Sequence, residues 1–255
     1  MGIELKSAVL PQEYGTYVFD LYGTLVDIHT DESLSMVWEK LALFYGYYGA
    51  LYEPGELKER YEVLVNGKEQ ALKKNLEEDP KYAHEASPEI EITEVFQALF
   101  LEKGVEADET LSVHAGQFFR ILSTEYVKTY PGTEAMLAQL KEKGKRVYLL
   151  SNAQRIFTEY EMHTLNIASY FDDIFISSDY QTKKPDERFF GILMEKHNID
   201  PKQTLFVGND SRTDIGGATQ VGMHTFYVNS NISPENDMAE NADYIVADFE
   251  RWETA

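Results

Sequence analysis

The stretch Thr16–Leu25, TYVFDLYGTL, decides the fold that we expect for this chain. Its first four residues favour a buried strand, and Asp20 follows that strand directly. Further apolar runs of the same kind recur along the chain, bounded by turn formers or polar residues. The runs that predict buried strands are Arg146–Leu150, Ile174–Ser177 and Thr204–Val207, and two more strands are expected at Thr225–Val228 and Tyr244–Val246.

Helical patterns separate these later strands. Glu134–Lys143, EAMLAQLKEK, carries apolar residues at helical spacing and ends at Gly144, and similar patterns cover Ala153–Leu165 and Glu187–His197. Strands that alternate with helices at this spacing predict a parallel sheet with right-handed crossovers. We therefore expect an α/β fold with a Rossmann-like core.

The chain between the first two predicted strands has helical patterns and little that predicts a strand. It predicts four helices, at Glu32–Tyr48, Gly55–Glu77, Ile90–Lys103 and Asp108–Lys128, punctuated by Pro54, Pro80 and Pro88. Four helices are too many for a βα loop, which is usually about 2–6 residues long. We therefore predict two domains, with residues 1–30 and 130–255 forming the core and residues 31–129 an inserted α-helical domain. The links at Val26–Thr30 and Thr129–Pro131 are expected to act as hinges.

Composition excludes several classes of function. The formal net charge is −21, which disfavours nucleic acid and anionic membranes as partners. There is no Cys, so neither disulfides nor thiol chemistry are expected. We see no signal peptide and no apolar run of about 18 residues, so we expect a cytoplasmic protein. The sequence makes no prediction of oligomeric state.

Polar side chains follow four of the predicted strands. Asp20 follows the first, and Ser151 and Asn152 follow the second. The remaining strand ends carry Lys184, then Asp210 with Asp214 four residues later. Because ligands bind at the carboxyl ends of strands in an open parallel sheet, we expect these side chains to converge. Carboxylates there would hold Mg²⁺, and the hydroxyl and ammonium groups would hold phosphate oxygens. Taken singly, each residue is more often a helix cap or a solvated loop residue, so the prediction rests on their joint order.

At this point the chain resembles the haloacid dehalogenase-like hydrolase superfamily. The motifs that carry the resemblance are Asp20–Leu25 (DLYGTL), Leu149–Asn152 (LLSN), Lys184–Asp186 (KPD) with Phe189, Val207–Ala218 (VGNDSRTDIGGA) and Tyr130–Gly132 (YPG). The resemblance covers residues 16 to 248, and residues 31–129 occupy the position and size of the family's helical cap, of the type called C1.

The resemblance implies a role for each matching residue. Asp20 would be the nucleophile that forms an aspartyl intermediate, and Ser151 and Lys184 would hold the phosphoryl group, with Asn152 and Thr24 also binding substrate. Mg²⁺ would bind Asp20, the Tyr22 backbone carbonyl and Asp210, with Asp214 in or next to its ligand shell. The implied reaction is the hydrolysis of a small phosphorylated metabolite. The chemistry agrees, since a carboxylate that attacks a phosphate dianion needs cations to cancel the repulsion.

One position departs from the phosphatase pattern. Phosphatases of this family usually carry a second Asp two residues after the nucleophile, and this chain has Tyr22 there. A phenol with a pKa of about 10 is a poor general base at neutral pH. The pattern at this position resembles the 2-haloacid dehalogenases, which need neither that acid nor a metal. We keep dehalogenation as the alternative function, and a catalytically weak binding protein as the third.

Two more residues bear on these alternatives. The dehalogenases carry an Arg early in the cap, whereas the first Arg of this insert is Arg60, which we interpret as a solvated helix residue. A pKa near neutrality makes His29, in the first link, a candidate substitute acid, although a plain surface histidine is the commoner case.

Overall fold

The computed structural model describes residues 9–10, 13–86, 88–237, 239, 241–246, 248–249 and 253–254. Its centre is a six-stranded sheet in the order β6-β5-β2-β7-β8-β9, with every pair of neighbours parallel. The strands are β2 (Thr16–Phe19), β5 (Arg146–Ser151), β6 (Asp173–Ile176), β7 (Thr204–Gly208), β8 (His224–Val228) and β9 (Tyr244–Val246). The predicted α/β fold and parallel sheet are confirmed, and each predicted strand is present to within a residue at either end.

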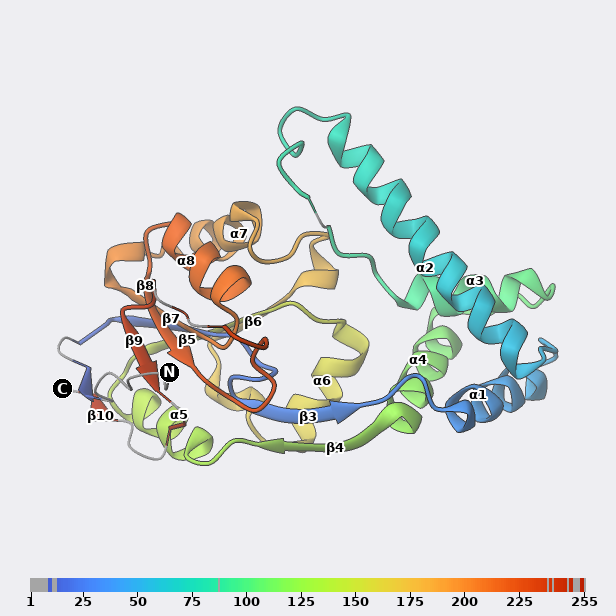
Figure 1. Cartoon of the computed structure of the whole chain (residues 1–255), viewed down its shortest axis with the longest axis horizontal. Helices are drawn as coiled ribbons and strands as arrows, with labels where there is room; N and C mark the ends of the chain where they lie inside the picture. The colour runs from blue at the N-terminus through green and yellow to red at the C-terminus, as the bar shows by residue number, and fades with distance from the viewer. Residues whose placement is uncertain are drawn as a thin grey trace.

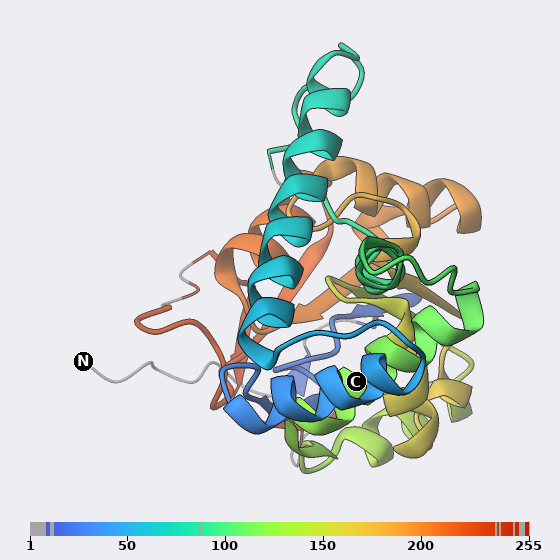
Figure 2. The ribbon, with the colours of Figure 1, turned by 90° about the vertical axis from the view of Figure 1, so that its right-hand side faces the viewer.

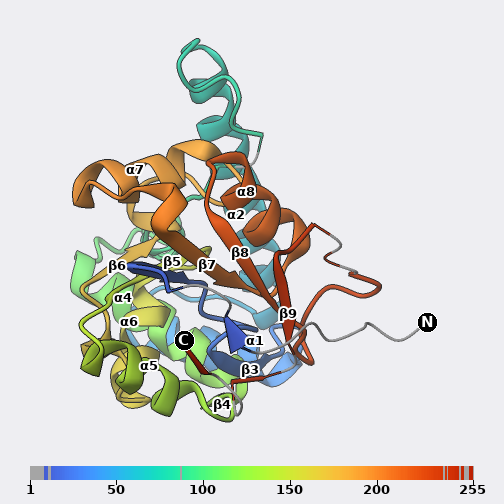
Figure 3. The same ribbon diagram turned by 90° about the vertical axis from the view of Figure 1, so that its left-hand side faces the viewer.

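Helices cover both faces of this sheet, as Figure 3 shows. One face packs against α5 (Thr133–Glu142) and α6 (Arg155–Thr164), and the other against α7 (Glu187–His197) and α8 (Gly217–Gln220). All four residues of β2 are buried. This double burial explains why the strands read as continuous apolar runs rather than as alternating patterns. Shorter elements are the 3₁₀ turns Ala168–Tyr170, Ser177–Asp179 and Pro201–Gln203, the π-helical turn Ser211–Gly216, and the parallel pair β1 (Val9–Leu10) and β10 (Glu253–Thr254).

Four helices form a second packed body beside the sheet, which we call the helical insert (Figures 1 and 2). They are α1 (Ser35–Tyr47), α2 (Pro54–Glu77), α3 (Thr93–Glu102) and α4 (Glu109–Ser123). Their core is aromatic, and the ring of Phe119 contacts the rings of both Trp38 and Phe96. Although α2 has 24 residues, no helix in the described part of the chain is apolar enough over a sufficient length to cross a membrane.

The two links between the core and the helical insert form a β-ribbon, which corrects part of the secondary-structure prediction. Val26–Thr30 is strand β3, and it pairs antiparallel with β4, Thr124–Thr129. The predicted helix Asp108–Lys128 therefore ends at Ser123. The β4 sequence TEYVKT is rich in β-branched and aromatic residues, which favour a strand once a partner is available. The expected hinges are thus hydrogen-bonded strands (Figure 1).

The chain between α2 and α3, residues 78–92, returns from the far end of α2 to the core, and we call it the connecting segment (Figure 1). His84 Nδ1 lies 2.8 Å from Asp186 Oδ2. Glu85 Oε1 lies 2.7 Å from Arg188 Nε. Asp186 and Arg188 belong to the loop and helix that follow Lys184. The connecting segment therefore lies over one side of the crevice at the carboxyl ends of the strands.

Candidate active site

The sheet creates a crevice where its strand order reverses. The two central strands, β2 and β7, are adjacent in space, but the chain leaves them toward opposite edges of the sheet. Ligands bind at such a switch point in open α/β sheets. Asp20 follows β2 and Asp210 follows β7 with one residue between. Both line a cavity of about 270 Å³, together with Tyr22, Lys184 and Asp214. The sequence prediction that these side chains converge therefore agrees with the geometry, although they come from segments far apart in the chain.

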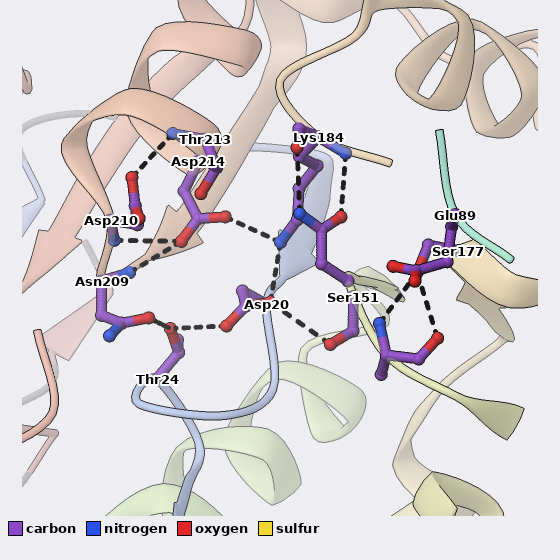
Figure 4. A network of polar contacts seen from close by, with 12 residues as sticks. Asp20, Thr24, Glu89, Ser151, Ser177, Lys184, Asn209, Asp210, Thr213 and Asp214 are labelled. Atoms are coloured by element: carbon purple, nitrogen blue, oxygen red, sulfur yellow. Dashed lines mark hydrogen bonds and ion pairs between the residues drawn. The ribbon is translucent and has the colours of Figure 1, made fainter. Parts of the chain in front are cut away.

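Lys184 lies between two carboxylates at the floor of this cavity (Figure 4). Its Nζ is 2.7 Å from Asp20 Oδ1 and 2.7 Å from Asp214 Oδ1, and all three side chains are buried. Burial alone would lower the pKa of Lys184, but the two carboxylates outweigh burial and raise the pKa above its ordinary value. Burial raises the pKa of Asp214 to about 6, with Lys184 opposing that rise. Lys184 is consequently a fixed cation against Asp20.

Two hydroxyl groups also reach Asp20 (Figure 4). Ser151 Oγ donates to Asp20 Oδ1 at 3.3 Å, and Thr24 Oγ1 lies 3.3 Å from Asp20 Oδ2. Thr24 Oγ1 is equally close to Asn209 Oδ1, and a single hydroxyl proton can serve only one of these acceptors at a time. Asn209 is not among the site residues predicted from the sequence. Its one signal was its place between Gly208 and Asp210 in the fourth motif.

Asn152 lies close to the site but bonds to the backbone of Lys184. Its Nδ2 donates to the Lys184 carbonyl at 2.9 Å, and its Oδ1 accepts from the Lys184 N–H at 2.8 Å. The family resemblance implies that Asn152 binds substrate. In the structure its amide is used on both sides to hold the loop that carries Lys184, and it lines the cavity next to that loop.

Asp210 and Asp214 shape the turn that follows β7. Asp210 Oδ1 accepts from the backbone N–H groups of Arg212 and Thr213, at 2.8 and 2.7 Å, so this residue caps the π-helical turn. Asp214 Oδ2 accepts from the N–H groups of Asn209 and Asp210, at 3.0 and 3.1 Å. Both oxygens of Asp214 are therefore engaged by the protein, since its Oδ1 faces Lys184. A Cβ at Gly208 would lie 2.4 Å from the Asp214 side chain, which explains the glycine.

Three of the residues that line this cavity, Asp20, Tyr22 and Asp210, are those expected from the sequence to provide oxygen ligands to a cation. No group of three or more His, Cys, Asp or Glu side chains among the described residues is arranged to hold a metal ion. Asp20 and Asp210 line the same cavity, and the backbone N–H groups of Arg212 and Thr213 both bind Oδ1 of Asp210. This donor set suits a hard cation that takes one or two carboxylates and keeps its waters, as Mg²⁺ does.

Tyr22 points its hydroxyl toward α6. The hydroxyl donates to Glu161 Oε2 and lies 3.1 Å from Thr158 Oγ1. Arg120 Nε donates to the other oxygen of Glu161 at 2.7 Å, and its guanidinium lies 5.7 Å from the centre of the Tyr22 ring. Burial, reinforced by the charge of Glu161, raises the pKa of Tyr22 above its ordinary value. The side chain at position 22 is therefore a neutral phenol.

Sequence reasoning did not single out Glu161 or Arg120. Glu161 is buried on α6, and Arg120 lies on α4 in the helical insert. They are separated by 41 positions, and Glu161 is 139 positions from Tyr22. No local motif joins three residues at such separations, so this contact had no signal in the sequence.

Arg60 and His29 lie outside the crevice. Arg60 pairs with Glu102 at 2.6 Å on the insert surface, which agrees with its interpretation as a solvated helix residue. His29 is on β3, with 54% of its side chain exposed, and lies 3.7 Å from Glu125. Neither lines the cavity around Asp20. This position does not favour His29 as a substitute acid.

Comparison with known proteins gives a family match. A family model described as haloacid dehalogenase-like hydrolase matches residues 14–222. A glyceraldehyde 3-phosphate phosphatase from Methanothermobacter thermautotrophicus is 32% identical over 115 residues, which are 45% of this chain and 51% of that protein. A phosphoglycolate phosphatase from Vibrio vulnificus is 26% identical over 241 residues, 93% of each chain. The chain spans about half the length of several curated relatives that it matches.

Solved structures show the same fold. A 2-haloacid dehalogenase from Pseudomonas syringae has a TM-score of 0.59 at 20% identity, over 93% of this chain and 95% of that one. A hydrolase from Bacillus subtilis, bound to magnesium, has a TM-score of 0.52 at 22% identity, over 94% of this chain and 96% of that one. At these identities the likeness concerns the fold alone.

Proposed function

Because this chain belongs to the haloacid dehalogenase-like hydrolase family, we propose that it is a Mg²⁺-dependent phosphatase of a small phosphorylated metabolite, working through an aspartyl-phosphate intermediate. The observation that carries the proposal is the position of Lys184, whose ammonium contacts Asp20 and Asp214 at 2.7 Å each. A buried cation against a buried carboxylate is what a carboxylate nucleophile needs in order to approach an anionic phosphoryl group.

Asp20 is the proposed nucleophile. One of its carboxylate oxygens forms a bond to phosphorus while the bond from phosphorus to the leaving oxygen breaks. Water then attacks the same phosphorus, which releases inorganic phosphate and restores the Asp20 carboxylate. Two transfers replace one difficult hydrolysis, and each has a lower barrier. The ion pair with Lys184 supports this role, because it holds Asp20 in one orientation.

Ser151, Thr24 and Lys184 are the proposed phosphoryl-binding groups. Both hydroxyls lie 3.3 Å from Asp20 oxygens, so they are close to the place where the transferred group would bind. Such donors stabilise the charge that spreads over the equatorial oxygens in a loose transition state. Asn152 contributes by fixing the Lys184 backbone.

Asp20, Asp210 and the Tyr22 carbonyl are the proposed ligands of Mg²⁺. When bound, the ion would neutralise charge on the phosphoryl oxygens. Asp214 is proposed to act next to these ligands, because its oxygens already bind Lys184 and two backbone N–H groups. It orients Lys184 and the backbone of the loop that carries Asp210.

Tyr22 favours the alternative function, 2-haloacid dehalogenation. A neutral phenol at this position cannot act as the general base of a phosphatase, and halide leaves without a proton. Against this alternative, a dehalogenase needs a cation that is free to bind halide. The guanidinium beside Tyr22 belongs to Arg120, and it already donates a hydrogen bond to the Glu161 carboxylate. The third hypothesis, a binding protein with weak catalysis, is disfavoured because Asp20, Ser151, Lys184 and Asp210 lie within one crevice.

A single experiment distinguishes the three functions. Purified protein is assayed against phosphate esters, acyl phosphates and 2-haloacids, each with Mg²⁺ and with EDTA. We expect phosphate release that depends on Mg²⁺. Halide release that persists in EDTA would establish the alternative, and binding without turnover of any compound would support the third hypothesis.

A further inference from the structure

A second, larger cavity adjoins the cavity around Asp20. It has a volume of about 760 Å³ and shares Asn152, Lys184 and Thr213 with the smaller one. The connecting segment forms one wall, and the loop that carries Lys184 forms the other. If the phosphoryl group binds at Asp20, the larger cavity is where the rest of the substrate lies. Its volume is within the range of about 300–1,000 Å³ that holds metabolite-sized ligands, and a two-carbon leaving group would fill only a small part of it.

The cations that line this larger cavity are already paired with carboxylates, apart from Arg212. Lys184 contacts Asp20 and Asp214, Lys183 Nζ lies 3.6 Å from Glu89 Oε2, and His84 Nδ1 lies 2.8 Å from Asp186 Oδ2. Arg212 is exposed on the cavity wall and forms no ion pair within the described part of the chain. A leaving group with a carboxylate would therefore have to compete with Glu89 for Lys183 and with Asp186 for His84, and among the described cations of this lining only Arg212 would be open to it.

The wall that the connecting segment contributes to this larger cavity carries two carboxylates, Glu85 and Glu89. Glu89 Oε1 accepts from Gln154 Nε2 at 3.1 Å. Its Oε2 lies 3.2 Å from Ser177 Oγ (Figure 4), whose single proton is also within reach of the Ala153 carbonyl at 3.0 Å. Glu85 is buried, and its Oε2 has no hydrogen-bond partner among the described residues. Ionised carboxylates only accept hydrogen bonds, so they complement hydroxyl groups. The described lining has no Phe, Tyr or Trp ring on which a nucleobase could stack.

We propose that the leaving group of the substrate is an uncharged, hydroxyl-rich alcohol, so that the substrate is a sugar phosphate, and that Glu89 selects against leaving groups with a carboxylate. This inference rests on the phosphatase function proposed above. It separates the chain from its phosphoglycolate phosphatase relatives, whose named substrate has a carboxylate on a two-carbon leaving group.

Competition between substrates tests the proposal. The values of kcat/KM are measured for glucose 1-phosphate, glucose 6-phosphate, phosphoglycolate and p-nitrophenyl phosphate with saturating Mg²⁺. In the wild type, kcat/KM for at least one sugar phosphate should exceed kcat/KM for phosphoglycolate by about tenfold or more. A ratio of this size corresponds to the free energy of one hydrogen bond to a charged group. Glu89→Gln should lower the ratio of sugar phosphate to phosphoglycolate by about the same factor, because it removes one negative charge and frees Lys183. The ratio does not depend on the fraction of folded enzyme.

Glu94→Gln is the matched control. It removes the same charge from the helical insert and breaks an exposed pair with Lys68 at 2.6 Å, but it lies outside the larger cavity. Its ratio should equal that of the wild type. A wild type that prefers phosphoglycolate, or a ratio that Glu89→Gln leaves within twofold, would overturn this inference alone. Failure to hydrolyse any of the four esters would overturn the proposed function and this inference with it.

Discussion

The Tyr22 hydroxyl donates a hydrogen bond to the carboxylate of Glu161, which comes from α6, 139 positions later in the chain. Arg120 of the helical insert binds the same carboxylate at 2.7 Å. The side chain two residues after Asp20 is thus tied to both the core and the insert. Position 22 therefore carries a phenol that donates to Glu161, and no carboxylate stands there to move protons for the leaving group or for water.

This relationship predicts a preference for good leaving groups. General acid catalysis is typically worth about 10²–10⁴-fold, so simple alkyl phosphates should be slower than aryl or acyl phosphates by about that factor. Because no carboxylate activates water, hydrolysis of the intermediate should also be slow, and p-nitrophenyl phosphate should give a burst. Tyr22→Asp should raise kcat/KM for alkyl phosphates more than for aryl phosphates. If it raises neither, Tyr22 does not occupy the position of the acid.

Tyr22→Phe should leave the chemistry unchanged and lower the stability. Since burial and Glu161 raise its pKa, the phenol stays neutral through its ordinary titration range near pH 10. The kcat/KM profiles of wild type and Tyr22→Phe should therefore superimpose from pH 5 to about pH 9. Loss of a hydrogen bond to buried Glu161 should lower the free energy of unfolding by about 1–3 kcal/mol, measured by urea denaturation. If the rise or the fall of kcat/KM with pH disappears in Tyr22→Phe, the phenol does take part in catalysis.

Asp210→Asn should weaken Mg²⁺ binding, because an amide oxygen is a poorer ligand for a hard cation than a carboxylate. Titration calorimetry of the folded proteins measures the affinity directly. Asp200→Asn is the matched control, since Asp200 caps a short helical turn as Asp210 does, through a bond from Lys202 N–H at 3.0 Å, but it does not line the cavity. Equal Mg²⁺ affinity in Asp210→Asn and the wild type would mean that Asp210 is only a cap.

Asp20→Asn should abolish turnover and leave the protein folded. Asn has nearly the same shape as Asp but is far less nucleophilic. Beryllofluoride should bind to the wild type at Asp20 as a mimic of the aspartyl phosphate, and it should not bind to the variant. Phosphate release by the variant within tenfold of the wild-type rate would remove Asp20 from the mechanism, provided that circular dichroism shows the same fold.

Arg188→Met should loosen the connecting segment. Arg188 binds Glu85 at 2.7 Å and lies 4.6 Å from the centre of the Tyr82 ring, so its loss leaves a buried carboxylate unpaired. Amide hydrogen exchange should rise in peptides that cover residues 78–92. Arg60→Met breaks an exposed pair with Glu102 and should have no such effect. Unchanged exchange in Arg188→Met would show that this ion pair does not hold the segment against the core.

The sequence by itself determined the sheet and the chemical groups at its carboxyl edge. Asp20, Ser151 and Asp210 lie at or just after the ends of buried apolar runs, and Lys184 lies in the loop after another apolar run. Such runs are recognisable without knowledge of their neighbours. Once the strands are known to be parallel, their carboxyl ends must share one edge, so convergence follows from topology alone.

The tertiary structure decided the contacts that have no period or motif. Val26–Thr30 reads as a polar link and becomes β3 only because β4 lies beside it. Asn152 binds the Lys184 backbone, and Tyr22 finds Glu161, because the sheet and α6 bring distant segments together. Local propensity and spacing contain no term for such pairs, since the free energy of each contact depends on a partner that the chain places only by folding.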